Sequence, residues 1–376
     1  MKRKIAILTQ PLHDNYGGLL QAYALSKTLN QYGDVLIINR WGGHNSYIKK
    51  FASKIKHSLI RNPNIPTKSQ KAIISQHTNA FREKYIPNIS QRITTDKGMR
   101  EHSKMGFNTY VVGSDQCWRP NYSPKITNFF LDFVRDKQNL TRISYAASFG
   151  TSEWEFNDEQ TKICKDLIQK FEGVSVRESS GVQLCKNHLN SDAIHVLDPT
   201  MLLDIEEYKK LTESENVSKS MGNLKVYVLD KSVEKTKLIE YVTEKLNLKS
   251  FEVMPDKRMR NARVTSNNVN EFIYPSPLVW LKGFQDAEFV ITDSFHGTVF
   301  SILHNLPFIA IGNERRGLSR FESLLQMFGL EDRLLIEYNI ENANEILKRK
   351  IKWSEVNNKL EKERKKAKNF LNTYLK

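Results

Sequence analysis

Short apolar runs of strand-forming residues alternate along this chain with segments whose apolar residues recur at helical spacing. The first such unit has a strand at residues 4–8, then a helix, then a strand at residues 35–38. The helix buries Ala22, Leu25 and Leu29 on one face. Further apolar runs predict strands at residues 110–112, 143–146, 174–176, 195–197, 225–229, 250–253, 289–292 and 308–311. Strands that alternate with helices predict an α/β protein with doubly wound parallel sheets.

The alternating elements form two successive series, and a chain of 376 residues is long enough for two domains with separate cores. The sequence predicts an N-terminal domain at residues 1–204 with a basic amphipathic insertion at residues 47–71. A C-terminal domain is expected at residues 205–350, and a final helix at residues 351–376 is expected to pack back on the first domain. The polar segment at residues 201–223 is predicted to be a linker.

Polar or glycine-containing turns follow several strands of the first series, at residues 15–18, 113–116, 147–150 and 177–179. The carboxyl ends of parallel strands share one edge of the sheet, and ligands of open α/β sheets bind there. The turns therefore predict a ligand crevice. Gly17 and Gly18 either let a ligand approach the backbone closely or make a tight turn. Their spacing lacks the GxGxxG pattern, so the sequence does not predict NAD or FAD binding.

The segment at residues 289–303, FVITDSFHGTVFSIL, predicts a strand, a tight polar turn and a helix. The turn offers helix N-terminal amides for an anion and the imidazole of His296 for proton transfer. Asp293 is expected either to orient His296 or to cap the helix. The alternative is that His296 is a turn histidine with only a structural role.

The formal net charge of +15 and a pI near 9.5 predict an anionic partner, which could be nucleic acid, anionic lipid or a phosphorylated substrate. Basic residues concentrate at residues 47–71 and 348–368. No aromatic residues interleave with the lysine run at residues 362–368, so we expect a solvated helix face and no nucleic-acid binding. The amphipathic stretch at residues 47–61 predicts either contact with an anionic membrane or a surface helix packed on its own domain.

The cysteines Cys117, Cys164 and Cys185 show no metal or redox spacing, and their odd number fits a reducing cytoplasm. No apolar run is long enough to span a bilayer, and the first apolar run is too short for a signal peptide. The sequence therefore predicts a cytoplasmic protein, with association to the inner face of the membrane as a further expectation.

Several motifs together resemble those of the polysaccharide pyruvyl transferase family, along nearly the whole chain. They are NYGGLLQAY at residues 15–23, GSDQ at 113–116, VRE at 176–178, LDPT at 197–200 and DSFHG at 293–297. The resemblance implies a GT-B-like fold, in which two Rossmann-like domains face each other across a cleft. It also implies transfer of a pyruvate ketal from phosphoenolpyruvate to a sugar of a surface polysaccharide or of its lipid-linked precursor.

For that reaction, we expect His296 to act as the general acid and base, and Asp293 to be the second catalytic residue. The donor needs cations and amides, for which the candidates are Arg177, Ser294, Gly297, Arg315, Arg316 and Arg320. The acceptor side is the first domain, with candidates Asn15, Tyr16, Gly17, Gly18, Gln21, Asp115 and Gln116. No cofactor and no metal are expected, and phosphoenolpyruvate is a co-substrate.

Ser294 occupies the place where the family resemblance implies an arginine that helps to hold the donor. Either Arg177 and the loop that ends at Arg320 supply the missing charge, or the donor is different. Two other functions therefore stay open. One is a GT-B-type glycosyltransferase that uses a sugar-phosphate donor, and the other is a non-catalytic protein that binds anionic glycan or lipid.

Overall fold

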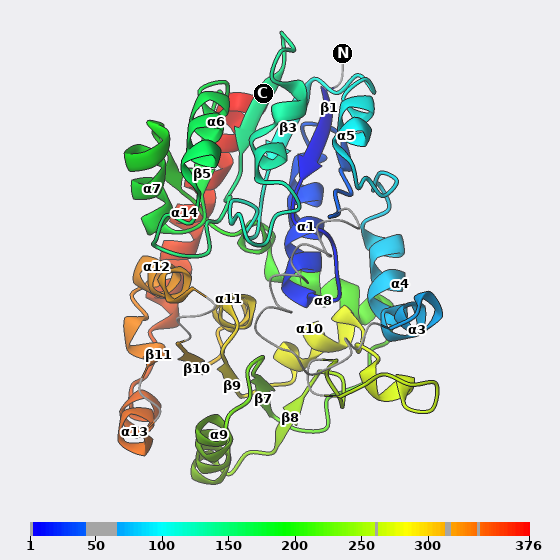
Figure 1. Ribbon diagram of the computed structural model, residues 1–376. Helices are drawn as coiled ribbons and strands as arrows, with labels where there is room; N and C mark the ends of the chain where they lie inside the picture. Colours follow the sequence, from blue (N-terminus) through cyan, green and yellow to red (C-terminus); the bar gives the residue numbers. More distant parts are fainter. Residues whose placement is uncertain (1–2, 43–65, 260–261, 313–316, 337–338) are drawn as a thin grey trace. The chain divides into compact units, whose positions relative to one another are not determined.

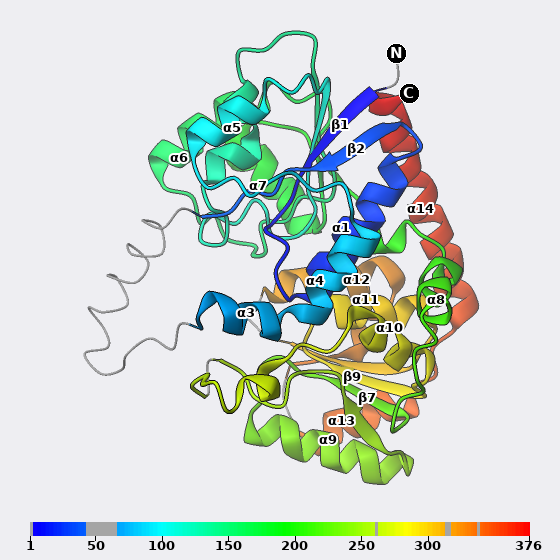
Figure 2. The same cartoon turned by 90° about the vertical axis from the view of Figure 1, so that its right-hand side faces the viewer.

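The computed structural model describes residues 3–42, 66–259, 262–312, 317–336 and 339–376. The chain divides into two compact units. The first comprises Met1–Pro199, Pro255–Tyr274 and Asn369–Lys376, and the second comprises Thr200–Met254 and Pro275–Lys368. Figure 1 and Figure 2 show the elements of each unit from two directions.

The first unit is built on a parallel sheet of strands in the order β2-β1-β3-β4. These strands are β1 (Arg3–Leu8), β2 (Gly33–Ile37), β3 (Thr109–Val112) and β4 (Thr141–Ser144). A parallel pair, β5 (Ser175–Val176) and β6 (Ile194–His195), continues from β4 through bridges such as that between Ala147 and Val176. Every residue of β3 is buried, as expected of a parallel strand covered on both faces.

Helices follow the strands of the first unit in the doubly wound manner. They are α1 (Tyr16–Leu29), α3 (Lys68–Ile74), α4 (Gln76–Tyr85), α5 (Asp96–His102), α6 (Asp158–Ile168) and α7 (Ser179–Leu189), with short 3-10 turns η1 (Ile126–Phe130), η2 (Asp132–Val134) and η4 (Val269–Phe272). A further 3-10 turn, η3 (Pro199–Met201), begins at the last residue of this part of the first unit and continues into the second. Local sequence sets their ends: Asn157 and Gln160, for example, form a capping box at the start of α6. A buried aromatic group that includes Trp118, Phe130 and Phe149 fills the core.

The second unit is built on a parallel sheet of strands in the order β11-β10-β9-β7-β8. The strands are β7 (Leu224–Tyr227), β8 (Ser250–Glu252), β9 (Phe289–Thr292), β10 (Phe308–Ile311) and β11 (Leu334–Leu335). The helices are α8 (Ile205–Ser214), α9 (Val233–Leu246), α10 (Pro277–Gln285), α11 (Phe295–Leu303), α12 (Leu318–Phe328), α13 (Ile340–Lys348) and α14 (Trp353–Leu375), with the turn η6 (Glu331–Arg333). In both views α9 and α13 cover one face of the sheet, and α10, α11 and α12 cover the other.

Strand order reverses once in each sheet. In the first unit the chain passes from β1 to β2 on one side and then to β3 on the other side of β1. In the second unit it passes from β7 to β8 and then to β9 on the other side of β7. Loops diverge at such a switch point and leave room for a ligand outside the carboxyl ends of the two strands. The topology therefore singles out the loops after β1 and β3, and those after β7 and β9.

The prediction of an α/β fold with two doubly wound parallel sheets is confirmed, and strands β9 and β10 have the predicted bounds. The predicted linker at residues 201–223 is wrong, because it contains α8, whose Tyr208 is buried. The compact units also differ from the predicted domain ranges. Pro255–Tyr274 belongs to the first unit, and only Asn369–Lys376 of the last helix belongs there too.

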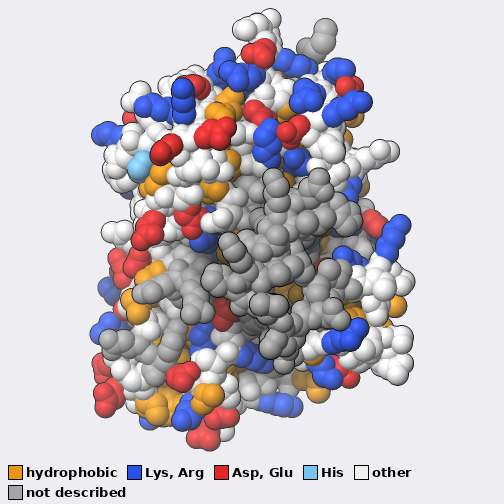
Figure 3. Space-filling model, in the orientation of Figure 1, with side chains coloured by type: hydrophobic (Ala, Val, Ile, Leu, Met, Phe, Trp, Pro, Cys, Tyr) orange, Lys and Arg blue, Asp and Glu red, His pale blue; other side chains and the backbone are white. Residues whose placement is uncertain are grey.

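Charged surface residues are mixed on the face that Figure 3 shows, where the described lysine and arginine side chains are interspersed with acidic ones. None of the helices in the described parts of the chain has the length and apolarity needed to cross a membrane. Cys117, Cys164 and Cys185 are all buried free thiols. Burial raises the pKa of Cys117 to about 12.

Lys225 on β7 is a buried cation whose charge state links pH to stability. Its ammonium donates a hydrogen bond to the Trp280 carbonyl over 3.1 Å and lies 4.6 Å from the centre of the Phe284 ring. Burial lowers the pKa of Lys225 to about 7, although Asp286 opposes the shift. The unfolded chain binds this proton up to about pH 10. The folded state therefore binds fewer protons than the unfolded state between about pH 7 and about pH 10, and stability rises with pH there.

We expect this contribution to disappear in Lys225→Met. Urea unfolding of both proteins from about pH 7 to about pH 10 measures it. The free energy of unfolding of the wild type, minus that of the variant, should increase with pH across this range. A difference that stays constant or decreases would show that the pKa of Lys225 is not lowered in the folded protein.

Candidate active site residues in each unit

Hydrogen bonds tie the loops at the switch point of the first unit together. Thr9 follows β1, and its hydroxyl donates to the Ser114 carbonyl after β3 over 2.8 Å. The Gln21 amide donates to Thr9 Oγ1 over 2.9 Å and accepts from the Ser114 N–H over 3.2 Å. Gln21 is fully buried, so its side chain fixes the two loops. The sequence predicts that Gln21 binds the acceptor sugar. In the structure, both the NH₂ group and the oxygen of its side-chain amide form hydrogen bonds within the protein.

The N-cap and the first turn of α1 contain four more of the predicted acceptor residues, Asn15, Tyr16, Gly17 and Gly18. Asn15 is the N-cap of α1, and its side chain accepts a hydrogen bond from the Gly18 N–H over 3.3 Å. Tyr16 is buried, and its ring meets that of Tyr274 edge to face at 6.3 Å. Gly17 follows Tyr16 in the first turn of the helix. These contacts show what forms the turn, and they leave its predicted acceptor role untested.

Arg177 follows β5 and lies between two carboxylates. Its Nη1 donates to Asp198 Oδ2 over 2.9 Å, and its Nη2 donates to Asp115 Oδ1 over 3.4 Å. The exposed fractions of the side chains are 1% for Arg177, 0% for Asp198 and 13% for Asp115. Burial lowers the pKa of Arg177, but Asp198, Asp115 and Glu178 outweigh this effect and raise it.

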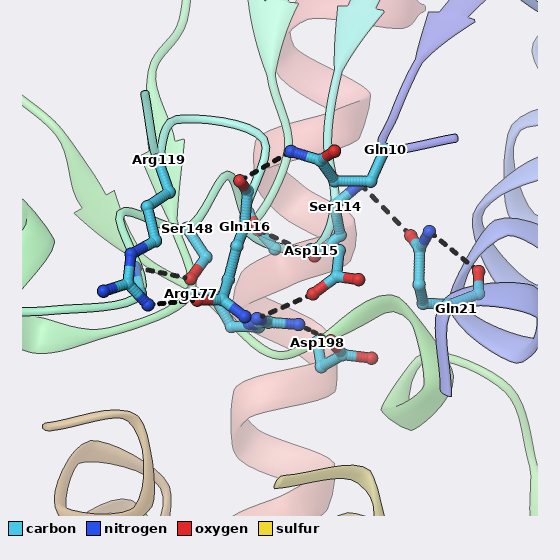
Figure 4. A network of polar contacts seen from close by, with 12 residues as sticks. Gln10, Gln21, Ser114, Asp115, Gln116, Arg119, Ser148, Arg177 and Asp198 are labelled. Atoms are coloured by element: carbon cyan, nitrogen blue, oxygen red, sulfur yellow. Dashed lines mark hydrogen bonds and ion pairs between the residues drawn. The ribbon is translucent and has the colours of Figure 1, made fainter. Parts of the chain in front are cut away.

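This pairing changes the interpretation of Arg177. A donor ligand needs an uncompensated positive charge for the phosphate or the carboxylate, whereas Arg177 is already paired with Asp115 and Asp198. Arg177 and Asp115, predicted on opposite substrates, contact each other within one unit. Figure 4 shows this network at the loops that follow the strands.

Gln116 lies beside Asp115, and its amide is held by an arginine that the sequence analysis does not single out. Arg119 Nη1 donates to Gln116 Oε1 over 3.2 Å. The same guanidinium grips Glu155 through two bonds of 2.9 and 2.8 Å. The only sequence signal for this contact is the three-residue spacing between Gln116 and Arg119, which is too common to be informative.

Asp293 follows β9 at the switch point of the second unit and holds the loop after β7. Its Oδ1 accepts from the Leu229 N–H over 2.6 Å, and its Oδ2 accepts from the Asp230 N–H over 3.0 Å. Lys235 Nζ donates to the same Oδ2 over 2.7 Å and to the Asp230 carbonyl over 2.8 Å. The sequence analysis misses Lys235, which is 58 residues away from its partner.

The structure corrects one role of Asp293, because the N-cap of α11 is Ser294. The Ser294 hydroxyl accepts from the Gly297 N–H over 3.4 Å. Gly297 allows the helix to start close to the strand, since a Cβ there would lie 2.2 Å from Thr292 Oγ1. Ser294 and Gly297 therefore have structural reasons for their identity, whatever they also do for a donor.

His296 lies in the first turn of α11 and is 6% exposed. The neighbouring Phe295 ring meets its imidazole edge to face at 5.3 Å. Arg320 on α12 is 5.7 Å from the centre of the Phe295 ring, so this cation lies near the motif, and its predicted role as a donor ligand stays a prediction. The predicted donor residues Arg315 and Arg316, and the amphipathic stretch 47–61, lie outside the described residues. Within the described parts of the chain, no three His, Cys, Asp or Glu side chains gather as a metal site.

Two α/β units, each built on a parallel sheet with polar motifs at its switch point, define the architecture of a GT-B-like enzyme. A model of the family described as polysaccharide pyruvyl transferase matches residues 15–315. The chain therefore belongs to the polysaccharide pyruvyl transferase family, and it is a transferase. The match includes every motif on which the resemblance rests, so that prediction is confirmed.

Solved structures support the fold. A UDP-N-acetylglucosamine 2-epimerase is 13% identical, with a TM-score of 0.53, and the match covers 100% of this chain and 97% of that one. S. aureus MnaA, in a co-structure with UDP, is 12% identical with a TM-score of 0.52 and the same coverage. The 2-epimerase from Rickettsia bellii is 11% identical with a TM-score of 0.50, again at 100% and 97% coverage. A search of curated proteins finds no match.

Proposed function

We propose that this protein transfers a pyruvate ketal from phosphoenolpyruvate to a sugar of a surface polysaccharide or of its lipid-linked precursor. The proposal rests on His296, which the DSFHG motif places in the first turn of α11, beyond β9 at a topological switch point. The family match covers this motif. An imidazole titrates near neutral pH, and the positive end of a helix favours an anion beside it.

The reaction makes defined demands on the site. The methylene carbon of phosphoenolpyruvate takes up a proton, two sugar hydroxyls lose theirs as they bond to the neighbouring carbon, and the bond from that carbon to the phosphate oxygen breaks. The products are the ketal and inorganic phosphate. His296 serves as the group that gives and takes protons. The N-terminus of α11, helped by Arg320, stabilises the anionic donor.

Charge supports a division of labour between the two switch points. In the first unit, Arg177 is outnumbered by Asp115 and Asp198, so the local charge disfavours a doubly negative donor. In the second unit, Asp293 is neutralised by Lys235, and the helix terminus is free of acidic residues in its first turn. We therefore assign the donor to the second unit and the sugar to the first.

Ligand stabilisation and turnover test the proposal. A ligand at about a hundred times its dissociation constant stabilises the folded protein by about 2.7 kcal/mol. We expect phosphoenolpyruvate to raise the melting temperature and inorganic phosphate to raise it less. UDP-sugars should have no effect. Stabilisation by UDP-sugars but not by phosphoenolpyruvate would instead favour a glycosyltransferase.

Turnover is measured with free and lipid-linked sugars, the latter in anionic vesicles because the net charge of +15 supports work at an anionic surface. Phosphate release should accompany a product that is heavier by one carboxyethylidene group. Phosphate release without that product would indicate hydrolysis and contradict the proposed transfer.

A further inference from the structure

The amide of Gln116 has a fixed orientation. Arg119 is donor-only, so the Gln116 atom that faces it must be the carbonyl oxygen, as the 3.2 Å bond shows. Gly150 lies directly beneath this side chain, since a Cβ there would be 2.1 Å from Gln116 Oε1. The guanidinium of Arg119 is held in place because it donates two hydrogen bonds to the Glu155 carboxylate. The NH₂ group of Gln116 is consequently turned away from Arg119, as a hydrogen-bond donor.

Asp115 has a matching orientation. Its Oδ1 accepts from Arg177, and Arg177 is anchored in turn by Asp198. Among the described residues, no hydrogen-bond donor contacts the second carboxylate oxygen of Asp115, and 13% of the side chain is exposed. The backbone of Asp115 has a φ of 69°, in the left-handed region that non-glycine residues adopt mostly under a structural or functional constraint. Asp115 therefore offers one fixed acceptor.

We propose that Asp115 and Gln116 form a preset acceptor–donor pair that recognises two neighbouring hydroxyls of an uncharged sugar ring. Arg177 positions the Asp115 carboxylate, and Arg119 positions the Gln116 amide. A hydroxyl both donates and accepts, so one sugar hydroxyl donates to Asp115 while the next accepts from Gln116. Sites built to bond hydroxyls reject analogues that lack them, because their polar groups are then left unpaired.

The charge around the pair explains the preference for an uncharged ligand. Among the described residues, Arg119 pairs with Glu155, and Arg177 pairs with Asp115 and Asp198, so the charge of these two arginines is already matched by three carboxylates. A sugar with a carboxylate at the recognised positions would meet Asp115 and be repelled. This inference rests on the proposed function for its substrate class, and it adds how Asp115 and Gln116 select the acceptor and that Arg119 positions Gln116.

The experiment compares Gln116→Glu, Arg119→Gln and the double variant in the phosphate-release assay. Gln116→Glu keeps an oxygen for Arg119 and replaces the NH₂ donor. We expect each single variant to raise KM for the acceptor about tenfold, the cost of about one hydrogen bond, while KM for phosphoenolpyruvate stays unchanged. The double variant should resemble the single ones, because Arg119 acts through Gln116. Arg135→Gln, which replaces an arginine that is 55% exposed, is the matched control and should behave as wild type.

Additive effects in the double variant, or a raised KM for phosphoenolpyruvate, would overturn the inference. A second measurement separates it from the proposed function. Calorimetric titration with a panel of uncharged methyl glycosides detects sugar binding without any donor. Binding by the wild type that weakens about tenfold in Gln116→Glu and in Arg119→Gln supports the inference, even if phosphoenolpyruvate is not the donor. No binding of any uncharged glycoside by the wild type, or equal binding by all variants, would overturn it.

Discussion

Replacement of His296 by alanine is expected to lower kcat by about 10²–10⁴-fold, the usual contribution of a positioned general acid and base. The melting temperature should fall somewhat, because the side chain is only 6% exposed, but the variant should still fold, because Ser294 makes the N-cap of α11. Steady-state kinetics with phosphoenolpyruvate and an acceptor sugar, together with thermal unfolding of the same preparation, measure both quantities. An active variant would remove His296 from the mechanism.

The same helix contains the matched control. His304 is the C-cap residue of α11, and its ring stacks on Phe284 at 5.9 Å. Burial lowers the pKa of His304 to about 3, and the cations Lys209 and Lys225 add to this shift, so it stays neutral at working pH. We expect His304→Ala to lower the melting temperature by removing packing, with kcat preserved. Two histidines of one helix should thus separate chemistry from stability.

The sequence predicts the parts of the fold that depend on local pattern. Strand β9 and helix α11 follow from an apolar run, a polar turn and a renewed apolar period within residues 289–303, so both elements and the bounds of β9 are predictable. The DSFHG motif and its place at the carboxyl end of a strand follow from the same stretch. Segment α8 is different. Its charged residues suggest a linker, but Asp204 caps the helix, and Tyr208 and Leu211 are buried on one of its faces.

Pairings between distant residues could not be predicted. Asp293 finds Lys235 across 58 residues, and Arg177 finds Asp115 across 62. No sequence pattern indicates either pair, because these residues are far apart along the chain and meet only through the order of the strands in the sheet. From the sequence alone, an arginine in a motif, such as Arg177, is interpreted as a substrate ligand, and only the structure shows that it pairs with carboxylates of the protein. The sequence predicts that the turns at residues 113–116 and 177–179 lie at one edge of the sheet, but it assigns Arg177 and Asp115 to different substrates, and their contact comes from the structure.

Replacement of Arg177 by methionine is expected to destabilise the first unit by about 3–5 kcal/mol, the typical cost of leaving a buried charge without its partner. Asp198 is fully buried and Asp115 nearly so, and both would lose a cation. In the variant, the loss of the Arg177 cation raises the pKa of the buried Asp198 carboxyl. The folded variant then binds more protons than the unfolded chain above about pH 4, so its stability falls as pH rises.

Urea unfolding at several pH values measures this loss for Arg177→Met. The double variant Arg177→Met/Asp198→Asn should recover part of it, because it removes one of the two carboxylates that lose the Arg177 cation. Arg135→Met, at a position that is 55% exposed, should stay within about 0.5 kcal/mol of wild type. If Arg177→Met instead keeps its stability and raises the dissociation constant for phosphoenolpyruvate, Arg177 is a donor ligand, as the sequence alone predicts. The assignment of the sugar to the first unit would then be wrong.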